Sequence, residues 1–316
     1  MKLLHETRIN LYSKVAQPKI CVLSDIHFSY QVKDARLDLI LEKMRELSPD
    51  YIFIPGDLID SNDMIFDKDE ENRLLSWLKN LGEIAKVILS VGNHDICRKP
   101  TDRHRISGEW EVYENPEFMK KVNALENVFY LNNEKYEDSK IYVLGLTLSP
   151  DYYNLLDQRP SVVHPAHEKL NEILKELDDI DQRLITKLPK NKLKFVLIHS
   201  PVLLTDYRVK AELTEFDYFI SGHMHNGIVP PIIDELWRSS TGFVSPTRNM
   251  LPRNIRTTRK TVEEKLIIAG AVTTWHECSG PLHKLNALYP SYFMTLNFSK
   301  DKQYEEKPYI KKKYLS

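Results

Sequence analysis

The chain has 316 residues, which suffices for one large domain or two of ordinary size. Its 44 basic and 45 acidic residues nearly cancel, so any binding of nucleic acid or of an anionic membrane must be local. With 42% hydrophobic residues, 10 glycines and 17 prolines, the composition excludes collagen-like, low-complexity and wholly disordered chains.

The cysteines and the apolar segments bear on the cellular compartment. Cys21, Cys97 and Cys278 are too few and too scattered for a disulfide framework, which favours a reducing environment. Charged residues interrupt the N-terminus, and no stretch of roughly 20 apolar residues occurs that could span a bilayer. We therefore expect a soluble cytoplasmic protein without a transmembrane segment, while the sequence leaves its oligomeric state open.

Five short apolar runs each end in polar residues that can bind metals. The runs are rich in Val, Ile, Phe and Tyr and are too short for typical helices, so each predicts a buried strand. They occupy residues 19–25, 50–57, 86–95, 194–199 and 216–225. Two of the connections between them have opposite character, acidic at residues 60–72 and basic at 98–105.

Helical patterns alternate with these strands. Apolar residues recur at three- and four-residue spacing over residues 37–47 and again over 170–184. Residues 265–272 and 291–298 alternate well enough to predict two further strands. Strand and helix in alternation predict an α/β sandwich, and the absence of internal repeats and of a Gly- or Ser-rich linker favours one domain.

The polar strand ends predict one metal site. In an open α/β sheet, ligands bind beyond the carboxyl ends of the strands, and all five polar endings belong to that edge. Together they offer carboxylate, amide and imidazole ligands for two divalent cations, for which Mn²⁺, Fe or Zn²⁺ are suitable and Ca²⁺ is not. The endings are Asp25-x-His27, Gly56-Asp57, Gly92-Asn93-His94-Asp95, His199 and Gly222-His223-x-His225.

Local spacing adds two expectations about this site. Residues i and i+2 of an extended segment point to the same side, so both members of Asp25-x-His27 and of His223-x-His225 should reach one cavity. The glycines that precede Asp57, Asn93 and His223 fit tight turns, where the backbone bends sharply and a ligand can approach.

The charge of such a site indicates the reaction. Two divalent ions, two carboxylates and one bridging hydroxide leave about one net positive charge, which suits an anionic phosphoryl group. Two ions roughly 3.5–4 Å apart can generate hydroxide at neutral pH and stabilise the attacking and leaving oxygens of an in-line displacement. We therefore predict metal-assisted hydrolysis of a phosphoester by a metal-bridging hydroxide.

These blocks, in this order, resemble the calcineurin-like metallophosphoesterase superfamily over about residues 19–298. The resemblance implies a four-layer sandwich in which two packed mixed β-sheets are flanked by helices. We expect a single domain over residues 1–316 with a core at about 19–298, a basic insertion at 238–260 and a C-terminal tail at 299–316. The Arg-rich stretch and residues 97–131 depart from the family pattern and name no substrate.

The resemblance also implies a role for each residue of the site. Asp25, His27 and His225 would bind one metal, Asn93, His199 and His223 the other, and Asp57 would bridge both. His94 would be a non-ligand histidine that protonates the leaving group or stabilises the transition state, with Asp95 as the acid beside it. Manganese is the metal we favour.

An Arg-rich stretch at residues 238–260 contains no acidic residue. We predict that Arg248, Arg253 and Arg256 contact the non-scissile part of an anionic substrate, and the alternative is a solvated surface. Nucleotides or cyclic nucleotides, nucleic acid and phospholipid-like or cell-envelope precursors remain open as substrates. The near-zero net charge does not favour extended nucleic-acid binding. A small phosphodiester is the preferred substrate, with a phosphomonoester as the alternative.

Two other function classes compete with this prediction. A non-catalytic scaffold with the same fold is the main alternative, but such proteins lose metal ligands and this chain retains the complete set. A Zn-dependent hydrolase of amides or lactams also uses two metals, but it typically contains a His-x-His-x-Asp-His run that is absent from this sequence.

Overall fold

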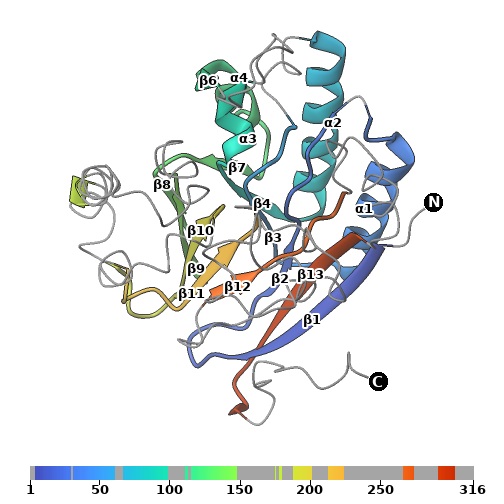
Figure 1. The fold of residues 1–316 in the computed structure, drawn as a ribbon. Coiled ribbons are helices and arrows are strands. Elements are labelled where there is room, and N and C mark those ends of the chain that lie inside the picture. Colours follow the sequence, from blue (N-terminus) through green and yellow to red (C-terminus); the bar gives the residue numbers. More distant parts are fainter. Residues whose placement is uncertain are drawn as a thin grey trace, which may run out of the picture.

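Two β-sheets lie face to face in the computed structural model of the chain, with helices packed beside them (Figure 1). The structure describes residues 4–29, 31–60, 67–98, 111–112, 115–147, 175, 178–179, 188–200, 213–223, 266–273 and 291–302. In the first sheet, β13 is antiparallel to β2 and all other neighbours are parallel. Its order is β1 (Leu4–Tyr12), β13 (Ser291–Ser299), β2 (Lys19–Val22), β3 (Tyr51–Pro55), β4 (Lys86–Ser90) and β7 (Val128–Leu131).

The second sheet is also mixed. Its strands β9 to β12 are parallel, and β8 pairs antiparallel with β9. Its order is β12 (Leu266–Ile268), β11 (Tyr218–Ser221), β10 (Leu193–Ile198), β9 (Ile141–Leu146) and β8 (Glu134–Glu137). A separate two-stranded pair joins β5 (Cys97–Arg98) to β6 (Glu111–Val112).

The strand β3 shows why its sequence is apolar throughout. Successive side chains of a strand point to opposite faces, so Ile52 and Ile54 pack with the helices while Tyr51 and Phe53 face the second sheet. The rings of Phe53 and Phe195 lie 5.3 Å apart across the interface between the sheets. A strand buried on both faces needs apolar residues at every position, which is the pattern the five runs share.

Two long helices cover the outer face of the first sheet. The predicted helix over residues 37–47 is confirmed as α1 (Asp34–Leu47), which buries Leu37, Ile40, Leu41 and Met44. The second is α2 (Lys68–Ile84), which buries Leu74, Trp77, Leu78 and Leu81 in the same core. Shorter helices are α3 (Asn93–Ile96) and α4 (Pro116–Asn123).

The acidic connection at residues 60–72 includes the start of helix α2. Asp67 caps the helix, because its side chain accepts hydrogen bonds from the backbone N–H groups of Asp69 and Glu70. Acidic residues in a first helical turn stabilise the positive end of the helix dipole. Residues 68–72 are therefore the start of a helix, and their negative charge stabilises its first turn.

The predicted α/β fold with two mixed sheets and helices is confirmed. The five apolar runs form β2, β3, β4, β10 and β11, although each strand ends before the polar residues we included in it. The last two predicted strands are β12 and β13, and β1 extends the first sheet with residues that precede the expected core. The helical pattern at 170–184 lies largely outside the described residues.

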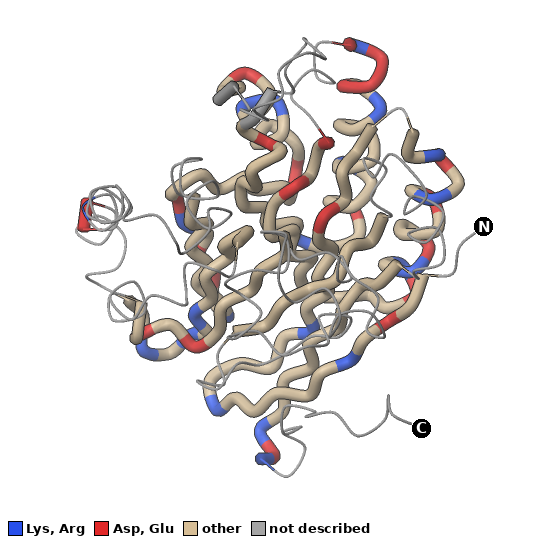
Figure 2. The backbone as a smooth tube through the Cα atoms, viewed as in Figure 1, with Lys and Arg blue, Asp and Glu red and all other residues tan. Residues whose placement is uncertain are grey.

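The charged residues surround the sheets. Figure 2 shows Lys, Arg, Asp and Glu mainly on the helices and near the ends of strands, while the central strands are almost free of them. This distribution is expected because a charged side chain buried between two sheets loses its hydration. Within the described part of the chain, no helix has the length and apolar character needed to cross a membrane.

Candidate metal centre

The loops that follow β2, β3 and β4 meet the loops that follow β10 and β11. The backbone N–H of His27 donates to the carbonyl of Asp57 at 3.0 Å, which joins the loops after β2 and β3. The backbone N–H of His223, after β11, donates to Oδ1 of Asp25 at 3.0 Å, which joins the two sheets. The predicted convergence of strand ends is therefore present among the described residues.

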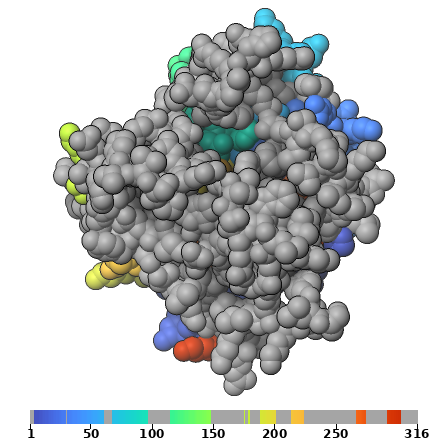
Figure 3. Space-filling view, in the orientation of Figure 1, coloured from blue at the N-terminus to red at the C-terminus, as the bar shows by residue number. Residues whose placement is uncertain are grey.

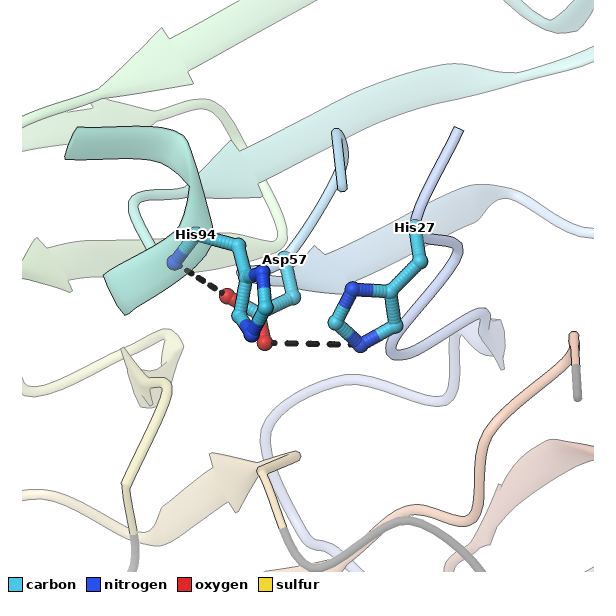
Figure 4. A group of neighbouring side chains, drawn as sticks. All are labelled: His27, Asp57 and His94. Carbon is cyan, nitrogen blue, oxygen red and sulfur yellow. Dashed lines mark hydrogen bonds and ion pairs between the residues drawn. The ribbon is translucent and has the colours of Figure 1, made fainter. Parts of the chain in front are cut away.

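Asp57 occupies the middle of this convergence, with an exposed fraction of 1%. Its Oδ1 accepts a hydrogen bond from the backbone N–H of His94 at 3.0 Å. Its Oδ2 lies 3.0 Å from Nε2 of His199 and 3.6 Å from Nε2 of His27. Figure 4 shows His27 on a loop and His94 on the short helix α3, with both side chains directed toward Asp57.

Two groups of ligand atoms share this aspartate. His27, Asp57 and His94 form one group, and Asp57, His199 and His223 form the other, with the atoms of each group within 4.8 Å of one another. In the space-filling view of Figure 3, teal atoms are visible among the grey ones near the centre of the picture, and the colour bar assigns them to the segment near residue 95. Each of these two adjacent groups has the donor atoms to hold a metal ion, and Asp57 belongs to both.

The protonation of Asp57 and His199 is governed by their mutual contact. Burial by itself raises the pKa of Asp57, but the positive charges of His199, His94 and His27 outweigh it and hold that pKa well below its usual range. Burial lowers the pKa of His199, and the charge of Asp57 reverses this effect and raises the pKa to about 9. A cation that binds here must displace a proton, so its affinity depends on pH.

Hydrogen bonds to backbone carbonyls orient two of the imidazoles. Nδ1 of His94 lies 2.7 Å from the carbonyl oxygen of Asp60, and Nδ1 of His199 lies 2.8 Å from that of Pro55. Because a carbonyl only accepts, each Nδ1 carries the hydrogen, and Nε2 remains the atom that can bind a metal or hold a proton. Each ring therefore presents only Nε2 to the site.

The side chain of Asn93 fits a cation ligand. Its Oδ1 is buried and has no hydrogen-bond partner in the described part of the chain. A buried amide oxygen without a donor is costly unless something else satisfies it. Together with imidazole nitrogens and carboxylate oxygens, it completes a donor set suited to Mn²⁺, Fe or Zn²⁺.

The backbone of the site is strained. Among the described residues, four of the seven non-glycine residues with positive φ are predicted ligands: Asp25 (φ 51°), His27 (45°), Asp57 (50°) and His223 (68°). Each such residue costs of order 1–3 kcal/mol, and such strain clusters at functional sites. The expectation that Asp25-x-His27 is extended is wrong, since both residues are left-handed in a loop after β2, and tertiary contacts set their directions.

Two glycines permit the sheets to approach each other here. Gly56 has φ 82°, and a Cβ atom on it would lie 2.6 Å from Nδ1 of His199. A Cβ atom on Gly222 would lie 2.0 Å from Oγ of Ser24 and 2.8 Å from a carboxylate oxygen of Asp25. The expected tight approach at these turns is confirmed, and larger residues would separate the ligands of the two sheets.

Asp95 and Asp60 support the loops around Asp57. The carboxylate of Asp95 accepts hydrogen bonds from the backbone N–H groups of Gly92 at 2.7 Å and Ile59 at 3.1 Å. Burial and the negative charge of Asp57 raise the pKa of Asp95 to about 7. Asp60 was not predicted, although its place three residues after Asp57 was a signal. Its carbonyl contacts His94, and its Oδ1 lies 3.7 Å from Nδ1 of His27.

The predicted site residues thus divide into two sets. The first set lies together in the loops just described and in α3, and it consists of Asp25, His27, Asp57, Asn93, His94, Asp95, His199 and His223. His225 and the predicted substrate contacts Arg248, Arg253 and Arg256 lie outside the described residues.

Comparison with known proteins identifies the family. The profile of the calcineurin-like phosphoesterases matches residues 18–227, which include all the predicted metal ligands. The chain therefore belongs to the calcineurin-like phosphoesterase family. This membership and the two His/Asp groups support a metal-dependent phosphoesterase.

Individual relatives are distant. The uncharacterized metallophosphoesterase Cj0846 of Campylobacter jejuni is 26% identical over 226 residues, which are 72% of this chain and 48% of that protein. The chain thus spans about half the length of this curated relative. A dimetal phosphatase from Danio rerio is 11% identical with a TM-score of 0.42, covering 80% of this chain and 87% of that one. The protein TT1561 of Thermus thermophilus is 12% identical with a TM-score of 0.37, covering 66% and 82%.

Proposed function

We propose that this protein binds two divalent metal ions and hydrolyses a phosphoester, with a small phosphodiester as the preferred substrate and a phosphomonoester as the alternative. The observation that carries the proposal is the position of Asp57, which is buried and shared by two groups of ligand atoms. An isolated carboxylate among histidines is explained by ion pairing alone, but two adjoining groups with an uncommitted amide oxygen nearby favour metal binding.

The proposal assigns the ligands to two metal ions. Asp57 is the shared ligand, and manganese is preferred over iron or zinc. In the proposal Asp25, His27 and His225 bind one ion and Asn93, His199 and His223 bind the other. When bound, the two ions supply a hydroxide at neutral pH and stabilise the negative charge of the phosphoryl oxygens.

The chain's own groups then have distinct tasks. Nδ1–H of His94 donates to the carbonyl of Asp60, so Nε2 is the nitrogen that takes up a second proton, and the protonated ring can then donate that proton to the leaving oxygen. The backbone N–H of His94 donates to Asp57, which fixes the distance between this histidine and the shared ligand. Asp95 connects the turn at Gly92 to Ile59 and holds the loops that carry Asp57 and His94.

His94 has an alternative role that follows from its position. Its ring packs edge-on against that of His27, with the centroids 4.6 Å apart, and its ligand atom belongs to the group formed with His27 and Asp57. A group this close to the others is placed well enough to bind a cation itself. The proposal assigns it to the leaving group, and metal counting in a His94 variant distinguishes the two roles.

The proposal extends to substrate and location. Arg248, Arg253 and Arg256 are proposed to hold an anionic, non-scissile part of the substrate, and the protein is proposed to act in the cytoplasm. The substrate contact is supported by the acid-free stretch at 238–260. The location is supported by the pattern of cysteines.

The decisive experiment measures metal content and activity on the same preparation. The purified protein is depleted with chelator, reloaded with Mn²⁺, Fe²⁺ or Zn²⁺, and assayed on bis(p-nitrophenyl) phosphate and on p-nitrophenyl phosphate. We expect two ions per chain and activity that returns with the metal and is greater on the diester. Equal hydrolysis by the metal-free protein would refute the proposal.

A further inference from the structure

A short segment after β12 connects the two halves of the candidate metal centre. The backbone N–H of Ala269 donates to the carbonyl of Ser221 at the end of β11, at 2.8 Å. Three residues later, the backbone N–H of Val272 donates to the carbonyl of Ser24, just after β2, at 3.0 Å. The segment 269–273 therefore spans from the strand that precedes His223 to the strand that precedes Asp25.

The last described residue of this segment contacts the ligand loop directly. The Thr273 hydroxyl lies 3.1 Å from the carbonyl oxygen of Asp25 and 2.7 Å from that of Ile26, and its single proton is shared between them. These carbonyls belong to the two peptide groups that connect Asp25 to His27. Thr273 is 4% exposed, so water does not readily replace its hydroxyl.

This contact explains how the ligand loop keeps its conformation. Asp25 and His27 both have positive φ, which non-glycine residues adopt only when the surroundings enforce it. A donor that holds both intervening carbonyls fixes the rotation of the two peptide groups and hence the direction of both side chains. The polypeptide reaches this arrangement through residues far apart in sequence, since Thr273 follows Asp25 by 248 positions.

An arginine holds the same segment from the helix side. Nε of Arg36 on α1 lies 3.1 Å from the carbonyl oxygen of Val272, and Nη2 lies 2.5 Å from it. The carbonyl of Ala271 accepts a hydrogen bond from the backbone N–H of Tyr292 at the start of β13, at 3.0 Å. The segment is thus anchored to the helix layer and to both sheets before it reaches Asp25.

We propose that segment 269–273 positions Asp25 and His27 for metal binding, with the Thr273 hydroxyl as the positioning group and Arg36 as its support. The inference rests on the proposed function, because it assumes that Asp25 and His27 bind a metal. It goes beyond that function, since the segment lies outside residues 18–227, which the family profile matches. Thr273 acts through the backbone of the ligands and touches no reacting atom.

The test compares three threonine variants by metal binding. Thr273→Val removes the hydroxyl and keeps the shape, whereas Thr273→Ser keeps the hydroxyl. Thr295→Val is the matched control, since Thr295 is 2% exposed in β13 and donates its hydroxyl to Glu6. Titration calorimetry with Mn²⁺ gives stoichiometry and affinity, the visible spectrum of the Co²⁺-loaded protein reports ligand geometry, and urea unfolding reports stability.

We expect Thr273→Val to weaken the binding of one ion roughly 10- to 100-fold and to change the Co²⁺ spectrum, as loss of a group that orients a ligand typically does. Thr273→Ser should retain affinity within about threefold by the same reasoning, and Thr295→Val should leave the affinity and the spectrum unchanged. Wild-type affinity in Thr273→Val, or an equal loss in Thr295→Val, would overturn the inference.

Two further results keep the test decisive. If Thr273→Val does not fold, Arg36→Met releases the same segment from the helix side, and it should weaken the same ion. Unchanged metal binding in Arg36→Met would then overturn the inference. If the wild-type protein binds no Mn²⁺ at all, the proposed function fails first, and this outcome is separate from any difference among the variants.

Discussion

Nε2 of His199 lies 3.0 Å from Oδ2 of Asp57, and this contact joins the two sheets at the centre of the candidate metal site. His199 follows β10 and Asp57 follows β3, and their exposed fractions are 0% and 1%. A buried ion pair is a poor source of stability, because the loss of hydration offsets most of the attraction. Its retention in the interior is explained better by the cation that both groups can bind.

The first prediction concerns the shared carboxylate. Asp57→Asn removes one negative charge between two cations and should reduce Mn²⁺ affinity and activity by more than the roughly 10- to 100-fold that loss of a ligand's partner costs. Metal analysis and hydrolysis of bis(p-nitrophenyl) phosphate measure both effects. Asp50→Asn is the control, because Asp50 binds the backbone N–H of Lys19 and the side chain of Lys140, away from the site. Full activity in Asp57→Asn would contradict its assignment.

The second prediction separates metal binding from proton transfer at His94. His94→Ala should retain both ions and lose roughly 10²–10⁴-fold in rate, which is the usual contribution of a general acid. The loss should be smaller for substrates that release p-nitrophenolate, because this leaving group needs little protonation. Metal counting and rates on substrates with poorer leaving groups test the prediction, with His5→Ala on β1 as control. A metal content of one ion would show that His94 is a ligand.

The third prediction concerns the pH dependence of stability through Asp138, between β8 and β9. Its Oδ2 accepts hydrogen bonds from the hydroxyls of Tyr51 and Tyr136 and from the ammonium of Lys86, and its Oδ1 accepts from two backbone N–H groups. Partial burial raises the pKa of Asp138, but these donors, Lys86 first, lower it below its usual value. The carboxylate therefore stabilises the fold above the unfolded-state pKa of about 3.9, and this contribution is lost as the pH falls further.

Unfolding of Asp138→Asn in urea measures this contribution. At pH 7 the variant should be about 1–3 kcal/mol less stable than the wild type, since several donors lose a charged acceptor. The difference should shrink at pH 3, where the unfolded wild-type chain binds the proton. Glu117→Gln is the control, because its pair with Lys120 is exposed and contributes little. A difference that stays constant between the two pH values would contradict the assignment.

The sequence could predict those elements of the fold that are determined by a local pattern of residues. The strands β3 and β4 were predictable because burial on both faces demands continuous apolar runs. The helix α2 was not, because the acidic residues that stabilise its first turn are also typical of a solvated connection. The residue types of the site were visible at the strand ends, and the family resemblance supplied their grouping.

The geometry of the site could not be predicted from local pattern. The positive φ of Asp25 and His27 opposes the preference of both residues, and the carbonyls between them accept a hydrogen bond from Thr273, which is distant in sequence. Asp60 likewise reaches His94 through a backbone carbonyl, a contact that no side-chain pattern reveals. Local sequence fails here because tertiary contacts determine the backbone.

The last prediction concerns the acid-free stretch at residues 238–260, which lies outside the described residues. Its positive charges repel one another unless an anion binds, and the stretch follows His223 closely in sequence. Simultaneous replacement of Arg248, Arg253 and Arg256 by Ala should therefore raise KM for a diester whose non-scissile arm is charged, such as a 5′-phosphorylated dinucleotide. The salt dependence of KM should weaken as well, because screening acts on the charges that were removed.

Two comparisons make this result specific to the arginines. For bis(p-nitrophenyl) phosphate, kcat should barely change, because its non-scissile nitrophenyl group is uncharged and offers the arginines no anion to bind. Replacement of Lys311, Lys312 and Lys313 by Ala removes an equal number of positive charges from another part of the chain and should leave KM unchanged. If the arginine variant has wild-type KM for every anionic diester, or if the lysine variant raises KM equally, these arginines do not hold the substrate. The stretch is then a solvated surface, and the metal-site predictions stand independently of it.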